Sequence, residues 1–493
     1  MELLYTYFLG PKGENTELFK KLINLAIEWN KKWRENFFED GSIYPADFFE
    51  SETFKEESQK LEKVFSEFLK RLEKNLPYFH PRYSAQMLKD PSIPALIGYF
   101  AVMLTNPNNH AYEGGPVTTE MEMEVVDDLL KLVGFKNGWG HLTSGGSLAN
   151  LEALWAVRDY RKKGIALFSK GSHYSWKRIC AILKVDFIEI DVDENYRIDL
   201  NQLEDALKDN TVMFVMANFG TTGVGAVDPI NEILKLKEKH GFHLHIDAAY
   251  GGYMRSLIID ENGQIIDFTK VEPTLKKFVY DNLIALSEAD SITIDPHKHG
   301  LVMYGAGGVL YKDENLRQVI LNTSPYTYHK KDKPNIGMFQ LEGSRPGASA
   351  GAVWLTHKLI PLNVNGFGKI LSQTLKTANY LHDKIQKLDG FSPLTHPDLD
   401  IFCFYKHDGN LKLSSINEKT LKIYNRLSIE NPSAKFILSK FVVDKTTAKR
   451  INPSLQIDEE SLTTLRSVFI KHWNTLSERL NYVDMLIEEI LAD

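Results

Sequence analysis

The stretch SITIDPHKHG, residues 291–300, decides how the rest of the chain is interpreted. Its first residues alternate as they do in a buried strand, and the stretch ends with Lys298 between two histidines and before a glycine. The ordinary interpretation is an exposed loop lysine, which is what most lysines are. An amine at the end of a strand can instead form an imine with a carbonyl compound. The decapeptide fits both interpretations, so the remaining sequence has to choose between them.

The composition is that of an ordinary globular protein. The 493 residues are 43% hydrophobic and 25% charged, and 58 Lys and Arg against 65 Asp and Glu give a net charge of −7. This balance gives no support for nucleic acid or an anionic membrane as a partner. Two cysteines are too few for a secreted disulfide framework, and no apolar run reaches the roughly 18 residues of a membrane span. We therefore expect a soluble cytoplasmic protein.

Hydrophobic periodicity changes along the chain. Residues 14–75 read as charged amphipathic helices whose apolar face needs a partner surface. From about residue 80 to 365, short β-like runs alternate with helical stretches, which is the pattern of a mostly parallel sheet covered by helices. After Gly366 we expect a helix, strands within 400–407 and 435–443, and a terminal helix after about residue 460.

These patterns predict an α/β fold. We expect an N-terminal helical segment at 1–78, a large domain at 79–365 with a mostly parallel sheet, and a small C-terminal α+β domain at 366–493. The lysine-rich segment HKKDKPNIG, residues 329–337, is either a solvated connection or part of a mobile active-site loop within 322–340.

A glycine turn opens the helical stretch in HLTSGGSLANLEALWAV, residues 141–157. Gly146 and Ser147 stand at its start, where free backbone N–H groups and the helix dipole suit a phosphate monoester. A plain serine N-cap explains the same residues. The spacings of a P-loop and of a dinucleotide-binding GxGxxG motif are absent.

Two further stretches carry polar residues at useful positions. In GFHLHIDAAYGGY, residues 241–253, Asp247 ends an alternating strand, where its carboxylate either pairs with a protonated ring nitrogen or serves a turn. His173, in GSHYSWKRICAIL, residues 171–183, either stacks on a planar cofactor or is a polar surface residue. His243 and His245 with His297 and His299 raise the question of a metal site, but no thiolate partners and no HExxH accompany them, so we expect no metal.

In an open α/β sheet, the carboxyl ends of several strands converge on one crevice, and Asp247 and Lys298 both lie at such ends. A phosphate-binding turn, a carboxylate for a ring nitrogen, a stacking imidazole and an imine-forming lysine are together what pyridoxal 5'-phosphate needs. Few other ligands need all four. The sequence therefore predicts a pyridoxal 5'-phosphate enzyme.

Between about residues 79 and 365 the chain also resembles a known family. The matching stretches are FHPRYSAQML, NPNNHAYEGGPVTTEMEMEV, WGHLTSGGSLANLEALWAVRD, NFGTTGVGAVD, HIDAAYGGY, SITIDPHKHG and LEGSRPGASAGAVWLTHKLIPLN. They resemble the group II pyridoxal-phosphate-dependent amino-acid decarboxylases of the aspartate-aminotransferase-like fold, and among these the bacterial tyrosine decarboxylases.

The resemblance implies roles for particular residues. Lys298 is expected to hold the cofactor, Asp247 to pair with its pyridinium, and His173 to stack on its ring. The other positions that the resemblance implies are Gly146, Ser147 and His297 by the phosphate, Thr222 and Ala249 beside the ring, and Tyr304 in catalysis. The family works as homodimers with shared active sites, so Gln86 or its neighbours are expected to reach substrate in the partner subunit. Tyr326 is expected to contact the substrate and is a second candidate, after Tyr304, for the source of the proton.

The substrate is less well determined than the reaction. We expect an L-amino-acid decarboxylase that acts first on an aromatic substrate, L-tyrosine. Glutamate or aspartate is the second candidate, because Arg345 is able either to accept an acidic substrate or to form a structural salt bridge. An aminotransferase or a carbon–carbon lyase of the same fold would need much the same residues. A non-catalytic protein that kept the fold for interaction is a further rival, although the intact set of Asp247, His173 and Lys298 argues against it.

Overall fold

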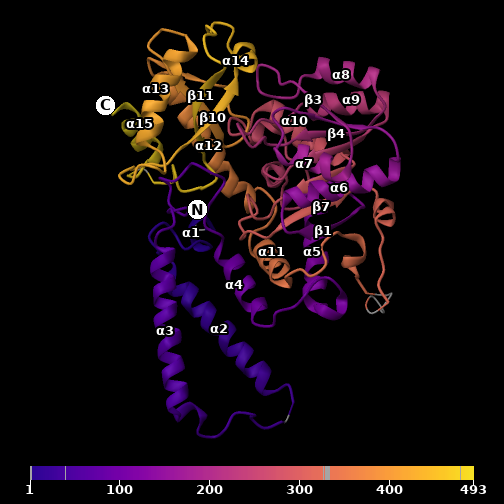
Figure 1. Ribbon diagram of the computed structural model, residues 1–493, viewed down its shortest axis with the longest axis vertical. Coiled ribbons are helices and arrows are strands. Elements are labelled where there is room, and N and C mark those ends of the chain that lie inside the picture. Colours follow the sequence, from indigo (N-terminus) through magenta and orange to yellow (C-terminus); the bar gives the residue numbers. More distant parts are fainter. Residues whose placement is uncertain (1–2, 39, 326, 328–332, 478, 493) are drawn as a thin grey trace.

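Two β-sheets with their covering helices and a pair of long N-terminal helices make up the molecule (Figure 1). The computed structural model describes residues 3–38, 40–325, 327, 333–477 and 479–492. The larger sheet lies in the main body, the smaller sheet lies beside it near the C-terminus, and the N-terminal helices project away from both.

The larger sheet is mostly parallel. Its strands are ordered β1-β7-β6-β5-β4-β2-β3, and β7 runs antiparallel to both of its neighbours. Strands such as β4 are buried along nearly their whole length, because helices cover both faces of the sheet. This confirms the predicted α/β class. The strands are β1 (Trp139–Thr143), β2 (Ile165–Ser169), β3 (Phe187–Ile190), β4 (Val212–Asn218), β5 (His243–Asp247), β6 (Ser291–Ile294) and β7 (Gly307–Tyr311).

Helices connect and cover these strands. Helices α4 and α11 pack so closely that a Cβ on Gly98 would lie 2.8 Å from the carbonyl oxygen of Gly351, so only glycine fits there. The helices of this part are α4 (Ile93–Met103), α5 (Pro116–Val133), α6 (Gly146–Arg161), α7 (Ser175–Leu183), α8 (Leu200–Asp209), α9 (Ile230–His240), α10 (Lys277–Ala285) and α11 (Gly347–Leu359).

The C-terminal part contains the smaller, antiparallel sheet in the order β10-β11-β9-β8. The expected helix after Gly366 is present, but the terminal helix predicted from about residue 460 is wrong at its start. The segment SLTTLRSV forms a central strand there, because it pairs with β10 on one side and β9 on the other. The elements are α12 (Phe367–Gln386), β8 (Phe391–Pro393), β9 (Ile401–Lys406), α13 (Leu413–Arg426), β10 (Ser439–Asp444), α14 (Lys445–Ile451), β11 (Ser461–Val468) and α15 (Tyr482–Leu491).

The N-terminal helices are amphipathic, and the second long one leaves its apolar face uncovered. After the short α1 (Leu3–Thr6), α2 (Thr16–Glu35) and α3 (Glu52–Leu72) form the projecting pair in Figure 1. No residue of α3 is buried, and every residue of that helix is described. Its predicted apolar stripe is 44–70% exposed, and consists of Leu61, Val64, Phe65, Phe68, Leu69 and Leu72. Within the described ranges, no helix is both long and apolar enough to cross a membrane.

Candidate active site

A pocket of about 490 Å³ opens at the carboxyl ends of β4, β5 and β6. Strands β5 and β6 are neighbours, so Asp247 at the end of β5 and Lys298 just beyond β6 meet at this pocket. The residues that line it are Ser144, Gly145, Gly146, Ser147, Leu148, Asn150, His173, Tyr174, Asn218, Gly220, Thr222, Asp247, Ala249, Tyr250, Asp295, His297, Lys298 and Tyr304. Nine of the eleven site residues predicted from the sequence are in this set, all except Gln86 and Tyr326.

The glycine turn forms one wall of the pocket. Helix α6 begins at Gly146 with Gly145 as its N-cap, and no side chain caps it, so Ser147 is not an N-cap serine. The first N–H groups of a helix have no acceptor within the helix. A Cβ on Gly146 would lie 2.8 Å from Oδ2 of Asp295, and one on Gly145 would lie 3.6 Å from the ring of His297. The turn therefore places the start of α6 at the pocket wall, and Gly146 leaves no room for a Cβ beside Asp295.

Asp247 is fixed by three hydrogen bonds. Its Oδ2 accepts from Nδ2 of Asn150 at 2.8 Å and from Nε1 of Trp176 at 3.2 Å, and its Oδ1 accepts from the backbone N–H of Ala249 at 3.2 Å. The side chain is buried, with the residue 8% exposed. These donors fix the carboxyl group at the pocket wall, where it can accept a hydrogen bond from a protonated ring nitrogen.

His173 lies across the pocket in a neutral state. Burial lowers its pKa, while Asp247 opposes the shift and Lys298 adds to it. Its Nδ1 lies 2.7 Å from the hydroxyl oxygen of Ser175, which holds the ring's orientation. His297 is similar, because burial lowers its pKa and its Nδ1 lies 2.7 Å from the carbonyl oxygen of Ala306.

Lys298 is held by a carboxylate that the sequence reasoning missed. Its Nζ lies 3.0 Å from Oδ2 of Asp295, and the lysine side chain is 21% exposed. Asp295 is 1% exposed, and its Oδ1 has no hydrogen-bond partner among the described residues. The signal was available, because Asp295 lies three residues before Lys298 in the stretch 291–300. Asp295 orients the amine toward the pocket.

The remaining predicted residues lie around the pocket mouth. Tyr304 is 59% exposed, and its hydroxyl donates to the carbonyl of Met87 at 3.2 Å. Gln86 is exposed beside Met87 and does not line the pocket of its own chain. Tyr326 lies outside the described residues. Thr222 lines the pocket, and its carbonyl accepts from Nη2 of Arg466 at 2.8 Å.

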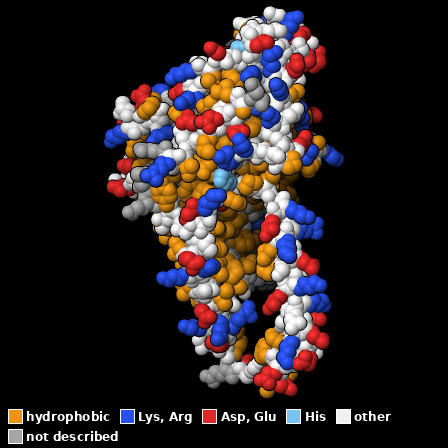
Figure 2. Space-filling view, turned by 90° about the vertical axis from the view of Figure 1, so that its left-hand side faces the viewer, with side chains coloured by type: hydrophobic (Ala, Val, Ile, Leu, Met, Phe, Trp, Pro, Cys, Tyr) orange, Lys and Arg blue, Asp and Glu red, His pale blue; other side chains and the backbone are white. Residues whose placement is uncertain are grey.

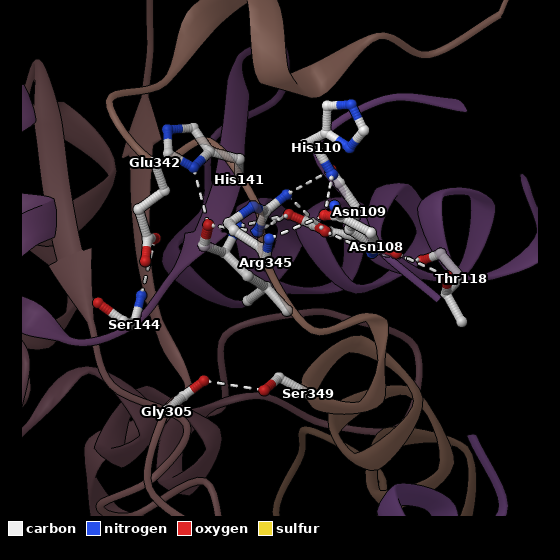
Figure 3. Close-up of polar contacts among 12 residues, drawn as sticks. Asn108, Asn109, His110, Thr118, His141, Ser144, Gly305, Glu342, Arg345 and Ser349 are labelled. Atoms are coloured by element: carbon white, nitrogen blue, oxygen red, sulfur yellow. Dashed lines mark hydrogen bonds and ion pairs between the residues drawn. The ribbon is translucent and has the colours of Figure 1, made fainter. Parts of the chain in front are cut away.

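Arg345 has a structural partner. Its Nη1 and Nη2 bind the two carboxylate oxygens of Glu122 at 2.9 and 3.0 Å, and both residues are buried. Nη1 also donates to the carbonyl of Leu142 at 2.8 Å. Figure 3 shows this network beside the contact in which the Ser144 N–H donates to Glu342 at 3.0 Å. Arg345 therefore joins α5 to the segment before α11, and its charge is already neutralised.

Of the histidines considered as metal ligands, His243 and His245 are hydrogen-bonded core residues. His243 and His245 share one face of β5, and each lies 2.8 Å from the hydroxyl oxygen of Ser291. Burial lowers the pKa of His243 to about 4 and holds the pKa of His245 well below its usual range. In the described part of the chain, no group of three or more His, Cys, Asp or Glu residues is arranged to hold a metal ion.

The pocket residues fit pyridoxal 5'-phosphate. The glycine turn would hold the phosphate, Asp247 would hold the ring nitrogen, and Lys298 would bind the aldehyde carbon. Two observations support the fit independently of any relative. The space next to Gly146 has no room for a Cβ, and the lining residue Asp295 has a buried oxygen without a hydrogen-bond partner among the described residues.

Comparisons with known proteins agree with this geometry. The pyridoxal-dependent decarboxylase conserved domain matches residues 45–406. The chain is 32% identical to an L-tyrosine decarboxylase of Enterococcus faecium, over 85% of each chain. It is 29% identical to an L-aspartate decarboxylase of Thermococcus kodakarensis, over 75% of this chain and 89% of the relative. Of the solved structures, Oryza sativa TDC with PLP and tryptamine has a TM-score of 0.72 at 17% identity, covering 97% of both chains. Mouse CSAD has a TM-score of 0.71 at 19% identity, covering 96% of this chain and 98% of its own.

Proposed function

The chain belongs to the pyridoxal-dependent decarboxylase family, and from this premise we propose that it decarboxylates an aromatic L-amino acid, with L-tyrosine as the first substrate. Membership makes it a pyridoxal-phosphate-dependent carboxy-lyase that acts on amino acids, so an aminotransferase and a non-catalytic relative are set aside. The substrate is the part that we propose.

The scarcity of positive charge in the pocket is the observation that supports an aromatic substrate. Among the described lining residues, Lys298 is the one lysine or arginine, and its amine is assigned to the cofactor. Arg345, the candidate partner for a second carboxylate, is bound to Glu122. Tyr174 and Tyr304 at the mouth are 64% and 59% exposed, and offer aromatic surface. An acidic side chain would have to be desolvated there without a cation, whereas an aromatic ring would gain apolar contact.

The named relatives act on two different kinds of substrate. Three that are 30–32% identical are L-tyrosine decarboxylases, and one that is 29% identical is an L-aspartate decarboxylase. We keep aspartate or glutamate as the second candidate on the strength of the latter relative.

The proposed mechanism assigns one task to each pocket residue. Lys298 supplies the amine that binds the cofactor, and Asp295 keeps that amine directed into the pocket. Asp247 keeps a proton on the ring nitrogen, and neutral His173 covers the ring without adding a competing charge. When bound, pyridoxal 5'-phosphate accepts the electron pair that the departing carboxylate leaves on Cα.

Tyr304 is the proposed proton donor to Cα. Burial raises the pKa of its phenol, and the nearby Asp295 charge adds to this shift, so it stays protonated at neutral pH. Its hydroxyl donates to the Met87 carbonyl at rest, and a rotation about the Cζ–O bond redirects the proton toward the pocket. A general acid must lie within hydrogen-bond reach of the atom that it protonates, about 3 Å.

A substrate comparison tests the proposal. The purified enzyme with excess pyridoxal 5'-phosphate is given L-tyrosine, L-phenylalanine, L-tryptophan, L-aspartate or L-glutamate, and CO2 and amine are measured without a keto acid. We expect kcat/KM for L-tyrosine to exceed that for both acidic substrates by about 10²-fold or more, as a site without a partner for a buried charge requires. A preference for aspartate or glutamate would establish the second candidate instead.

We also propose that the enzyme is a homodimer that uses the N-terminal helices. Figure 2 shows hydrophobic side chains gathered over the lower part of the molecule, where α2 and α3 project. The exposed stripe of α3 includes Phe65 at 56% and Phe68 at 51%, and soluble proteins seldom leave so continuous an apolar surface uncovered.

Light scattering on the purified chain tests this assembly. We expect a dimer, and we expect Phe65→Glu with Phe68→Glu to give a folded monomer, because two buried carboxylates would face the partner. Lys70→Glu, on the polar side of the same helix, is the control and should remain a dimer. A monomeric wild-type chain refutes the dimer, and a dimeric double variant moves the interface elsewhere.

A further inference from the structure

A buried lysine outside the set of lining residues holds a segment that contacts Tyr304. Lys471, three residues beyond β11, is 3% exposed. Its Nζ donates to the carbonyl of Tyr83 at 2.8 Å and to the carbonyl of Leu88 at 2.7 Å. The ammonium also lies 5.1 Å from the centroid of the Tyr83 ring. One side chain from the C-terminal part thus holds both ends of the segment 83–88.

The middle of this segment is held by the same strand region. Nη1 of Arg466, on β11, donates to the carbonyl of Ala85 at 2.9 Å, and the hydroxyl of Ser439 donates to that carbonyl at 2.7 Å. The backbone N–H of Val468 donates to the carbonyl of Ser84 at 2.8 Å. The carbonyl groups on both sides of Met87 are therefore tied to β10, β11 and the residues that follow.

Met87 links this segment to the reaction site. Its carbonyl, next to the held carbonyl of Leu88, accepts the hydrogen bond from the hydroxyl of Tyr304 at 3.2 Å. The ring of Tyr304 lies 4.7 Å from the ring of His297, which also lines the pocket. A change in the path of residues 83–88 would therefore move the acceptor that sets the position of the Tyr304 hydroxyl.

Packing alone does not require a lysine at position 471. A buried amine must have its N–H donors satisfied inside the protein, whereas an apolar side chain of similar size has no such requirement. An amine that donates to two carbonyl groups directs a backbone segment, because both acceptors must stay within hydrogen-bond reach of one nitrogen.

We propose that Lys471 is a positioning residue that sets the place of the Tyr304 hydroxyl through the segment 83–88. The inference rests on the proposed role of Tyr304 as proton donor. A hydroxyl displaced by a fraction of an ångström transfers its proton less effectively, whereas the cofactor and the substrate carboxylate, which bind elsewhere in the pocket, are held as before.

A double-mutant cycle tests the proposal, with Lys471→Met, Tyr304→Phe and the double variant. Loss of the amine should lower kcat for L-tyrosine about tenfold. KM and the dissociation constant of pyridoxal 5'-phosphate, measured by absorbance titration, should change less than about threefold. In the Tyr304→Phe background the same substitution should have little further effect on kcat, because the group that it positions is gone.

The matched control is Lys449→Met. Nζ of Lys449 donates to the carbonyl groups of Pro453 and Leu455, each at 2.7 Å, in the same part of the chain but away from the pocket. This variant should keep the wild-type kcat. If Lys471→Met yields too little folded protein, Lys471→Gln, which keeps two N–H donors without the charge, takes its place in the cycle.

The outcomes separate the two claims. An unchanged kcat in Tyr304→Phe removes the proton donor and with it the positioning role. A strong effect of Tyr304→Phe together with either an unaffected Lys471→Met or multiplicative effects in the double variant leaves Tyr304 in place and overturns the role of Lys471. An equal loss in Lys449→Met also overturns it, because the effect is then general to lysines that tie carbonyl groups.

Discussion

The hydrogen bonds of the pocket predict clearly what the substitution Asp247→Asn would do. Oδ2 of Asp247 accepts from Asn150 and from Trp176, whose indole N–H is always a donor. The new amide must therefore turn its oxygen toward these donors. Its NH2 group then faces Ala249 and the pocket, where the carboxylate had offered an acceptor.

Rotation of Asn150 does not relieve this arrangement. Its Oδ1 lies 3.0 Å from Nε2 of His245, and Nδ1 of that histidine lies 2.8 Å from the Ser291 hydroxyl oxygen. A flipped Asn150 would put its own NH2 group against His245 and disturb a fully buried chain of hydrogen bonds. Asp247→Asn thus replaces a charged acceptor at the pocket with a neutral donor.

The loss follows from the charge that is removed. Breaking one partner of a buried charged pair costs about 3–5 kcal/mol, and each 1.36 kcal/mol in the barrier is about tenfold in rate. Because the ring nitrogen needs its proton most when electrons leave Cα, most of this energy is expected to be lost from the transition state. We expect kcat to fall roughly 10²- to 10³-fold.

The assay measures amine formation from L-tyrosine at saturating substrate, with cofactor occupancy read from the absorbance spectrum of the same sample. Asp290→Asn is the control, because Asp290 lies next to β6 at the opposite end of the sheet, paired with Lys237 at 2.6 Å. It should leave kcat unchanged. A cofactor-loaded Asp247→Asn enzyme with a kcat within about threefold of the wild type would refute the reasoning.

Three further predictions concern other parts of the molecule. Lys298→Ala should abolish turnover while leaving the thermal unfolding midpoint within a few degrees, since the side chain lies in an open pocket; turnover at the wild-type rate would remove the assignment. Arg345→Met should lower the free energy of unfolding by about 3–5 kcal/mol, because Glu122 is left buried and unpaired; a denaturant titration checks this. The ratio of tyrosine to aspartate turnover should stay unchanged, which the two rates check. Burial lowers the pKa of Lys471 to about 7 and that of Lys89 to about 8, so between pH 7 and 9 the unfolded chain holds more protons and stability rises with pH. Lys471→Met should reduce this rise by up to about 1 kcal/mol per pH unit, and an unchanged slope would contradict the low pKa.

Local sequence determined the class of fold and most of the candidate site. Alternating and continuous apolar runs depend on neighbours along the chain, so they identified strands such as β4 and β5 without tertiary information. Glycine before a helix and charged residues at strand ends are equally local signals. Because parallel strands bring their carboxyl ends to one edge, Asp247 and Lys298 could be assigned to one pocket from the sequence.

Tertiary structure decided what depends on partners far away along the chain. The choice between a substrate-binding and a structural Arg345 rested on Glu122, which lies 223 positions away. Lys471 and the Tyr83 carbonyl are 388 positions apart, so no local pattern marked that lysine. Residues 461–468 form a strand because β9 and β10 lie on either side of it, although the sequence predicted a helix nearby. Hydrogen bonds and ion pairs between distant residues form only once the chain has folded, and the sequence alone carries no signal of which carbonyl or carboxylate a given cation will meet.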